Sequence, residues 1–514
     1  IPSPSFSAVP RTEDFQPLPS LEQILAKKDS FSLLQALTAF SKELDPSFNP
    51  YSFAKDFFQL SEKLKKRIEG KKKDGKIIKT LNSFIFAELG FQPDSSPDKQ
   101  HQIQNLMIHK ILESKKAYCL GLSALYLLFS EILNLPIYGV SVPGHFFVRY
   151  ERENFSQNIE TTQKGKSLSD SYYIKKYKIS DDLLDRGVYL SNLEPKEVVV
   201  EFLNNRGNYF YRLGNLEKAE ADFNLALAHS LNFIPAYGSK GFIALRKGAL
   251  KEARNYFKEA LEINPFYGMA LLGMGEIYLK LNHLKKAEEY FQRLVELEPE
   301  NPLGLTNLGL IYGRKGHLDK ALELHQKAVY YDTQCLYAYN NLAATYYRMG
   351  KTEEAIATFQ FILKQNPQFF PALHNIILAL EKSGLTERAR KQKKELIEYY
   401  RSLLKDSPKE DRYYYELARL VREENIGEAL QLIQQALGLR PYFPDYVEFL
   451  AETYALKGDT IKARETLRFF LENSGQAYLY NEKRIEKSIQ KYYELEKEGK
   501  KLTSSLKDFE EELS

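Results

Sequence analysis

The feature that most constrains this chain is a repeat of 34 residues in its second half. Small residues return at that spacing, and a second series of alanines keeps the same period. The first series is Gly207, Gly241, Gly275, Gly309 and Ala343, and the second is Ala219, Ala253, Ala287, Ala321, Ala355 and Ala389. A fixed period of this length is typical of arrays of helix pairs, in which each pair packs only on its neighbours. The pattern predicts an all-α superhelix from about residue 200.

Aromatic, glycine and proline residues complete the repeats. A large residue stands three positions after most of the small ones, a turn glycine such as Gly214 or Gly350 follows, and a proline such as Pro265 closes several units. This pattern resembles the tetratricopeptide repeat. The resemblance implies six repeats over residues 200–403, two further repeats over residues 410–476, and a capping helix and tail over residues 477–514.

Two columns of polar residues fall on the first helix of the repeats, which in tetratricopeptide arrays lines the concave face. An amide column and a basic column lie seven residues apart, and therefore on one helical face. The candidate peptide-binding residues are Asn205, Asn307, Asn341, Asn375, Arg212, Arg246, Arg314 and Arg348. A primary amide can donate to and accept from a peptide backbone, and the basic column favours acidic segments or a C-terminal carboxylate. We expect a protein or an extended peptide in this concave groove; the other interpretation is that these residues only satisfy loops and solvent.

A different pattern precedes the repeats. Cys119 opens an apolar run of helical character that continues to Leu133. A β-branched and aromatic run follows, and a Pro-Gly turn then precedes His145 at the head of a second strand-like run. A polar loop leads from there to Glu160. A cysteine at a helix start, with a histidine and a carboxylate on successive strands, is a workable arrangement for a thiol nucleophile, its base and an orienting group.

Each of these residue types suits its task. A thiol reacts as the thiolate, which a helix N-terminus and a neighbouring imidazolium both favour. His145 needs an acceptor for its second ring nitrogen, and Glu160 is the natural candidate. Asn158, two residues earlier on the strand, is the alternative third member of the site. Taken singly, Cys119 also fits a small buried apolar residue, and His145 a strand histidine satisfied by its neighbours.

The strings AYCLGLSALYLLF, LNLPIYGVSVPGHFFVRY and NIETT resemble the transglutaminase-like core, a papain-related cysteine fold. The resemblance is to a bacterial branch in which this core follows a helical segment and precedes tetratricopeptide repeats. It implies Cys119 as nucleophile and His145 as base, with Glu160 where the family usually has aspartate. The chain contains no tryptophan, so a side-chain donor to an oxyanion has to be of another type.

The resemblance also divides the first half of the chain. We expect a helical subdomain and an α+β transglutaminase-like core over residues 21–190, after a flexible Pro/Ser-rich lead-in over residues 1–20. Residues 164–185 are polar and rich in tyrosine, and we interpret them as the end of the first domain and a connector. A basic run over residues 63–76 is interpreted as a solvated helix end and loop.

Composition excludes several classes of protein. A net charge of +4 on 72 basic and 68 acidic residues argues against a nucleic-acid binder. Neither Cys119, Cys335 nor the histidines show metal-ligand spacing, so no metal and no cofactor are expected. No apolar run reaches the roughly 20 residues of a transmembrane helix. The compartment stays open, because an exported protein that has lost its leader before Ile1 and a cytoplasmic protein both fit.

Together these patterns predict a multidomain protein: a transglutaminase-like domain followed by an all-α superhelix. Its expected function is a thiol-dependent amide or peptide hydrolase or acyl transferase whose repeats recruit a protein or peptide. The alternative is a non-catalytic interaction scaffold with a degenerate transglutaminase-like domain.

Overall fold

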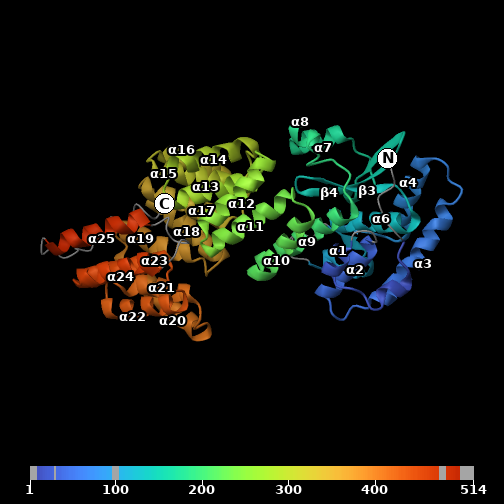
Figure 1. The fold of residues 1–514 in the computed structure, drawn as a ribbon. Coiled ribbons are helices and arrows are strands. Elements are labelled where there is room, and N and C mark those ends of the chain that lie inside the picture. Colours follow the sequence, from blue (N-terminus) through green and yellow to red (C-terminus); the bar gives the residue numbers. More distant parts are fainter. Residues whose placement is uncertain (1–8, 28–30, 95–102, 474–481, 498–514) are drawn as a thin grey trace. The chain divides into compact units, whose positions relative to one another are not determined.

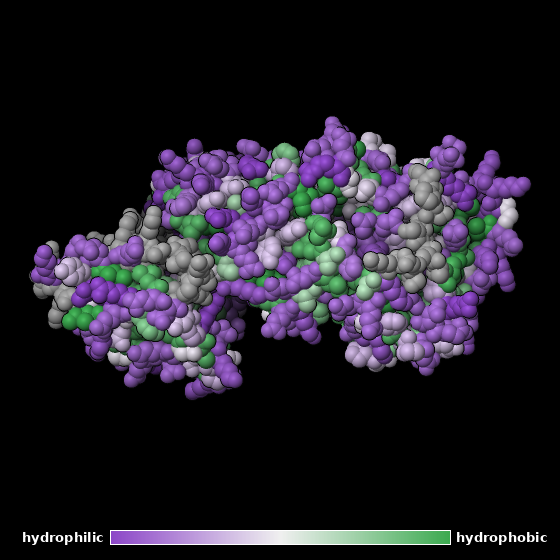
Figure 2. Space-filling model, in the orientation of Figure 1, coloured by the Kyte–Doolittle hydropathy of each residue, from purple (hydrophilic) through white to green (hydrophobic). Residues whose placement is uncertain are grey.

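A computed structural model describes residues 9–27, 31–94, 103–473 and 482–497 of the chain (Figure 1). The chain forms two compact units, Ile1–Ile243 and Ala244–Ser514. The surface seen in Figure 2 is mostly hydrophilic, with apolar residues in small patches. Within the described ranges, no helix is both long enough and apolar enough to cross a membrane.

The first unit is organised around α6 (Cys119–Leu133), which is apolar on all sides and almost wholly buried. A helix without a polar face has to be covered all round. Short helices and the sheet provide that cover. The preceding elements are η1 (Thr12–Phe15), α1 (Leu21–Ala26), α2 (Leu33–Leu44), α3 (Pro50–Ile68), α4 (Asp74–Asn82), η2 (Ser83–Glu88), η3 (Ile103–Leu106) and α5 (Ile108–Ser114).

Side chains cap several of these helices at their N-termini, where backbone N–H groups lack partners. Ser32 caps α2 by accepting from Gln35 N. A carboxylate from α6 adds to this cap: Glu131, which is 1% exposed, accepts from Leu33 N at 3.0 Å and Leu34 N at 2.8 Å. Burial raises the pKa of Glu131 to about 7. The far end of α6 is thereby bonded to the start of α2.

The expected flexible lead-in over residues 1–20 needs a correction. Residues 1–8 lie outside the described part of the chain, but Thr12–Phe15 form a 3-10 helix. The Phe15 side chain is 2% exposed, and its ring meets Phe58 of α3 edge-on at a centroid distance of 6.4 Å. One buried aromatic ring anchors a segment whose Pro-rich composition alone indicated no structure.

A three-stranded antiparallel sheet lies against α6. Its strands are β3 (Ile137–Val142), β4 (His145–Arg152) and β5 (Phe155–Ile159), in the order β3-β4-β5. A turn through Gly144, whose φ is +69°, joins β3 to β4 and pairs Val142 with His145. Two further short strands, β1 (Gln92–Pro93) and β2 (Lys116–Ala117), pair in parallel just before α6.

The two faces of the sheet belong to different cores. Val148, Tyr150 and Ile159 pack in the core that contains α6, whereas Val140 and Phe147 pack with Tyr173. Alternation of side chains along a strand produces this division. The second face is covered by α7 (Asp170–Tyr177) and α8 (Asp181–Asp185), which lie in the stretch interpreted as the end of the first domain and a connector.

Eight consecutive helix pairs follow in the described chain, and α25 (Glu482–Lys497) comes after them. The predicted all-α array is thereby confirmed, while the expected tail after residue 497 lies outside the described residues. The pairs are α9 (Pro195–Arg212) with α10 (Leu216–His229), α11 (Ile234–Lys247) with α12 (Leu250–Ile263), α13 (Gly268–Lys280) with α14 (Leu284–Leu297), α15 (Pro302–Arg314) with α16 (Leu318–Tyr331), α17 (Leu336–Arg348) with α18 (Thr352–Gln365), α19 (Phe370–Lys382) with α20 (Thr386–Asp406), α21 (Asp411–Val421) with α22 (Ile426–Leu439), and α23 (Pro444–Lys457) with α24 (Thr460–Asn473).

The repeating small residues are explained by the ring that faces them. A Cβ atom at Gly275 would lie 2.5 Å from the Phe291 ring, and one at Gly207 would lie 2.7 Å from the Phe223 ring. The ring residue itself recurs every 34 residues, and in one repeat it is His325. His325 is 2% exposed and its pKa is lowered to about 4 by burial, so it packs as a neutral ring.

We expect Gly275→Ala to lower the free energy of unfolding of the array by about 1–3 kcal/mol, because the added methyl group overpacks the helix pair. Gly438→Ala is the matched control. It also lies in a helix, but a Cβ added there would meet no atom within 4 Å, so the expected effect is neutral or slightly stabilising. Urea unfolding monitored by circular dichroism measures both variants, and equal destabilisation would contradict this account of the repeat.

Candidate functional site

Cys119 is the first residue of α6, directly after the N-cap Tyr118. Backbone N–H groups in the first turn of a helix have no intrahelical partner, which leaves partial positive charge near the half-buried thiol. Gly121 lets this turn approach its neighbours. A Cβ there would lie 2.8 Å from Ile111 Cδ1 and 2.9 Å from Ala117 Cβ. Close packing therefore holds the turn that carries the thiol.

His145 is the first residue of β4, and its Nε2 lies 2.7 Å from Glu160 Oε2. Interaction with Cys119 raises the pKa of the same imidazole. Because Glu160 occupies Nε2, the nitrogen that remains for the thiol is Nδ1. Burial alone would lower the pKa of His145, but the hydrogen bonds and the electrostatic attraction from Cys119 and Glu160 raise it to about 9. These interactions favour the charged form of His145.

Glu160 is 2% exposed and is surrounded by donors. Its Oε2 accepts from His145 and from the Tyr173 hydroxyl at 2.8 Å, and its Oε1 accepts from Thr162 N at 3.0 Å and from the Thr162 hydroxyl. Burial would raise the pKa of this carboxyl, but His145 and the other donors lower it to about 2. The longer glutamate side chain is accommodated because it also caps η4 (Thr161–Gln163).

The loop that carries Glu160 is bonded to the helix that carries Cys119. Thr161 Oγ1 lies 3.1 Å from Ser123 Oγ and donates to Cys119 O at 3.4 Å. On the other side of the loop, Asn82 of α4 donates to Gly165 O at 2.9 Å. The loop that carries Glu160 is therefore bonded to the backbone of Cys119 at one end and to α4 at the other, and these bonds hold the carboxylate near the thiol.

Asn158, the alternative third member, lies in a separate network. Its Oδ1 accepts from Arg149 Nε at 2.8 Å, and its Nδ2 donates to Asp170 Oδ1 at 2.7 Å and to Leu168 O at 3.0 Å. Arg149 also donates to Asp170 at 2.7 Å. This buried amide therefore attaches the start of α7 to the sheet, and Glu160 is the residue that contacts His145.

Two tyrosines of α7 complete the site, and sequence analysis assigned them no role. Tyr173 is 0% exposed, donates to Glu160 and stacks on Phe147 at a centroid distance of 4.2 Å. Tyr177 stacks on His145 at 6.3 Å with an interplanar angle of 15°. The spacing of four between the two rings, after a Ser-Asp helix start, was the signal that both face one side of a helix.

Several amides of the column already make hydrogen bonds, two of them within their own helix and one to a neighbouring helix. Asn205 donates to Glu201 O at 2.8 Å, Asn307 donates to Leu303 O at 3.0 Å, and Asn375 donates to Asn340 Oδ1 at 3.1 Å. A primary amide has a second N–H and an oxygen, so these bonds leave capacity for a ligand. Asn341 is half-buried on α17.

The basic column lies in the last turns of its helices, where cations also interact favourably with the helix dipole. Arg212, Arg246 and Arg348 are exposed, and Arg314 is half-buried. In the described parts of the chain, no group of three histidine, cysteine or acidic residues is arranged to hold a metal ion.

Comparison with known families finds matches over residues 52–369. Residues 52–204 match the transglutaminase-like superfamily. Residues 204–268, 244–306, 290–323 and 336–369 match tetratricopeptide-repeat models. Repeats of this kind typically bind protein partners. A search of curated protein sequences finds no match.

Solved structures resemble the repeats. A tetratricopeptide repeat protein from Parabacteroides merdae is 18% identical, and the match covers 49% of this chain and 98% of that one with a TM-score of 0.37. A thermophilic TPR protein from Thermus thermophilus is 22% identical over 35% of this chain and 98% of that one, with a TM-score of 0.32. YrrB, described as a TPR protein with an unusual peptide-binding site, is 27% identical over 34% of this chain and 90% of that one, with a TM-score of 0.27. The family matches confirm the predicted fold class: the chain combines a domain of the transglutaminase-like superfamily with an array of tetratricopeptide repeats.

Proposed function

We propose that the first domain is a thiol-dependent amide or peptide hydrolase or acyl transferase of transglutaminase-like type, and that the repeats recruit its protein or peptide substrate. The observation that carries this proposal is the connected series of Cys119, His145 and Glu160. A buried carboxylate bonded to one nitrogen of an imidazole, with a thiol at the other, is the arrangement that favours an ion pair between thiolate and imidazolium.

In the proposed reaction, Cys119 Sγ attacks the carbonyl carbon of a carboxamide or peptide bond. The N–H groups of the first turn of α6 stabilise the oxyanion that forms. The C–N bond then breaks, His145 gives its proton to the leaving amine, and a thioester remains on Cys119. Water or an incoming amine attacks the thioester, His145 accepts the proton, and the thiolate leaves. Glu160 keeps His145 oriented throughout and stabilises its charged form whenever it holds the second proton, and Tyr173 holds Glu160.

The repeats would deliver the substrate. Their amide and basic columns fit an extended acidic segment, since each amide retains donor and acceptor capacity and the arginines supply positive charge. The alternative, a scaffold whose first domain has lost catalysis, uses the same repeats without the thiol chemistry.

We expect Cys119 to react with iodoacetamide at least about tenfold faster than Cys335 at neutral pH. Cys335 is a matched internal control, because it is also half-buried and is the N-cap of α17. His145→Ala is expected to abolish the difference. It removes the imidazole beside Cys119, and both cysteines then have only a helix N-terminus to favour the thiolate. Peptide mass spectrometry measures both rates in one sample. Slow, equal labelling of both cysteines in the unmodified chain would support the scaffold alternative.

Glu160→Gln is expected to lower the free energy of unfolding by about 2–4 kcal/mol, because one amide oxygen replaces a carboxylate that accepts from four donors. The raised pKa of His145, about 9, contributes stability that is complete below about pH 6.5 and is lost as pH rises through 9. The lowered pKa of Glu160, about 2, contributes stability that is complete above about pH 4.5 and is lost as pH falls through 2.

The difference in melting temperature between the unmodified chain and Glu160→Gln should therefore be largest between about pH 4.5 and 6.5 and should shrink toward pH 9. Thermal unfolding across this range measures it. Asn158→Ala is the control. It removes the hydrogen bonds to Arg149 and Asp170, so its effect on the melting temperature is not tied to the titration of His145 and Glu160. A difference for Glu160→Gln that stays constant from pH 5 to pH 10 would show that the ion pair does not form.

For the repeats, we expect acidic peptides with free C-termini to bind more tightly than matched basic peptides, and the double variant Asn307→Ala, Asn341→Ala to weaken that binding at least about tenfold. Asn473→Ala is the matched control, because Asn473 donates to Phe469 O at 2.7 Å, as Asn307 does to its own helix, but lies outside the amide column. Fluorescence anisotropy with labelled peptide pools measures the affinities. Equal binding of acidic and basic pools would overturn the assignment of the groove.

A further inference from the structure

Residues 63–79 concentrate positive charge that the fold does not use. They contain nine lysines and arginines and two acidic residues, a net charge of +7, whereas the whole chain carries +4. One of the two acids, Asp74, is engaged elsewhere: it accepts from Tyr150 OH at 2.7 Å and pairs with Arg152 at 3.3 Å, both on β4. The charge of Asp74 is therefore directed to the sheet, and Glu69 is the acid of this segment that remains among the cations.

Most lysines of this segment have no side-chain partner among the residues that the structure describes. Lys65 pairs with Glu62 at 3.5 Å, and Lys71 donates to Arg67 O. Within the described ranges, neither a side-chain hydrogen bond nor an ion pair is made by Lys63, Lys66, Lys72, Lys73, Lys76 or Lys79. Like charges gathered on one short segment repel one another, so an anion that bridges them would be stabilised.

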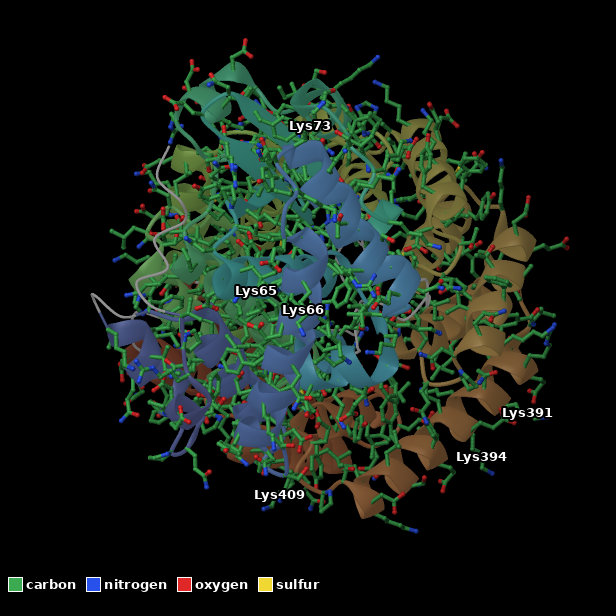
Figure 3. All side chains as sticks on the ribbon, turned by 90° about the vertical axis from the view of Figure 1, so that its right-hand side faces the viewer. Lys65, Lys66, Lys73, Lys391, Lys394 and Lys409 are labelled. Carbon is green, nitrogen blue, oxygen red and sulfur yellow. The ribbon has the colours of Figure 1, made fainter. Side chains whose placement is uncertain are left out.

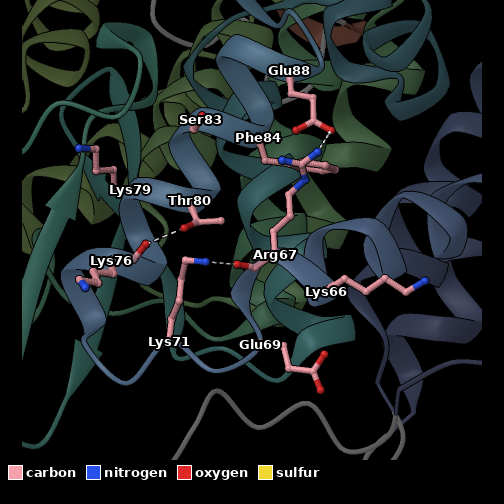
Figure 4. A pocket seen from close by; sticks show the side chains of 10 residues that line it. All are labelled: Lys66, Arg67, Glu69, Lys71, Lys76, Lys79, Thr80, Ser83, Phe84 and Glu88. Carbon is pink, nitrogen blue, oxygen red and sulfur yellow. Dashed lines mark hydrogen bonds and ion pairs between the residues drawn. The ribbon is translucent and has the colours of Figure 1, made fainter.

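Several of these cations line one hollow between the end of α3 and α4, with a volume of about 580 Å³ (Figure 4). Arg67 and Lys71 lie at its centre, with Lys76 and Lys79 of α4 on one side and Lys66 of α3 on the other. Arg67 is held in place by Glu88 at 2.7 Å. A volume of this size suits a small ligand, for which pockets of roughly 300–1,000 Å³ are usual.

The geometry points to a compact ligand that carries several phosphate groups. Lysine presents a point charge with three donors, which suits phosphate oxygens, and several lysines in one small hollow call for several negative charges on one small molecule. Ser83 adds an exposed hydroxyl to the wall. The aromatic ring of the pocket, Phe84, is only 1% exposed, so it offers no face on which a nucleic-acid base could stack.

This site is distinct from the thiol site but is joined to it through α4. Asp74 at the start of α4 contacts the strand that begins with His145, and Asn82 at its end contacts the loop that carries Glu160. A ligand that bridges α3 and α4 would therefore stabilise α4, which contacts both β4 and the loop of Glu160. Its binding does not depend on whether Cys119 is catalytic.

The test measures binding of inorganic tripolyphosphate to the full chain by isothermal titration calorimetry, and by the rise in melting temperature that a ligand of the folded state produces. The pocket variant is Lys66→Gln, Lys76→Gln, Lys79→Gln. The matched control is Lys391→Gln, Lys394→Gln, Lys409→Gln, which removes the same charge from exposed lysines of α20 and the loop after it (Figure 3). All six side chains are exposed, so both variants should fold, and circular dichroism checks this.

We expect binding by the unmodified chain, a loss of at least about tenfold in the pocket variant, and a change within about twofold in the control. The single variant Lys79→Glu should weaken binding in the same direction. Vesicles that contain a phosphorylated inositol lipid distinguish a lipid headgroup from a soluble ligand. If the chain cosediments with the vesicles and tripolyphosphate prevents this, the ligand is a lipid headgroup. If the chain binds tripolyphosphate but not the vesicles, the ligand is soluble.

Three results would overturn the proposal. They are the absence of tripolyphosphate binding, equal weakening by the pocket and control variants, and tighter binding of a single-stranded oligonucleotide than of tripolyphosphate at equal ionic strength. The last result would identify an extended nucleic-acid surface in place of a compact site.

Discussion

A buried carboxylate needs hydrogen-bond donors, and the first domain is arranged so that Glu160 receives them. Strand β4 brings the imidazole, the turn after Glu160 brings an N–H and a hydroxyl of Thr162, and α7 brings the phenol of Tyr173. Removing any of these elements would leave part of the buried charge unpaired. The sheet, the loop and α7 therefore depend on one another through a single side chain, and the helix that presents Cys119 depends on them through Thr161.

The repeats are held together by a different principle. The pairs that carry Gly207, Gly275 and Gly309 place a ring from the second helix against a residue of the first helix that has no side chain, and this contact recurs every 34 residues. His325 shows what the position requires. It takes the place of phenylalanine, bonds Thr345 Oγ1 at 3.0 Å and Thr306 O at 3.2 Å, and is kept neutral by burial. Shape and apolar character are thus retained even where the residue is nominally polar.

Local patterns predicted the elements well, and long-range contacts account for the rest. The apolar run from Cys119 to Leu133 coincides with α6, and His145 heads its strand as expected, because periodicity and turn residues act over a few positions. The burial of Phe15 and the network of Asn158 with Arg149 and Asp170 depend on partners distant in sequence. Spacing on a strand suggested that Asn158 could face His145, whereas pairing with Arg149 directs its amide elsewhere.

The contact between Glu131 and α2 shows that the cysteine helix depends on a segment upstream of the family match. The family match begins at residue 52, which places α2 outside the recognised domain. Yet the carboxylate at the far end of the cysteine helix accepts from Leu33 and Leu34, and Arg206 of α9 pairs with Glu43 at the end of α2 at 2.8 Å. A fragment that began at residue 52 would lack Leu33 and Leu34. Glu131, on the helix that carries the thiol, would then have lost both backbone donors. A piece of this chain that keeps this support of the cysteine helix therefore begins before Ser32, and the helical segment upstream of the family match shares the core of the first domain.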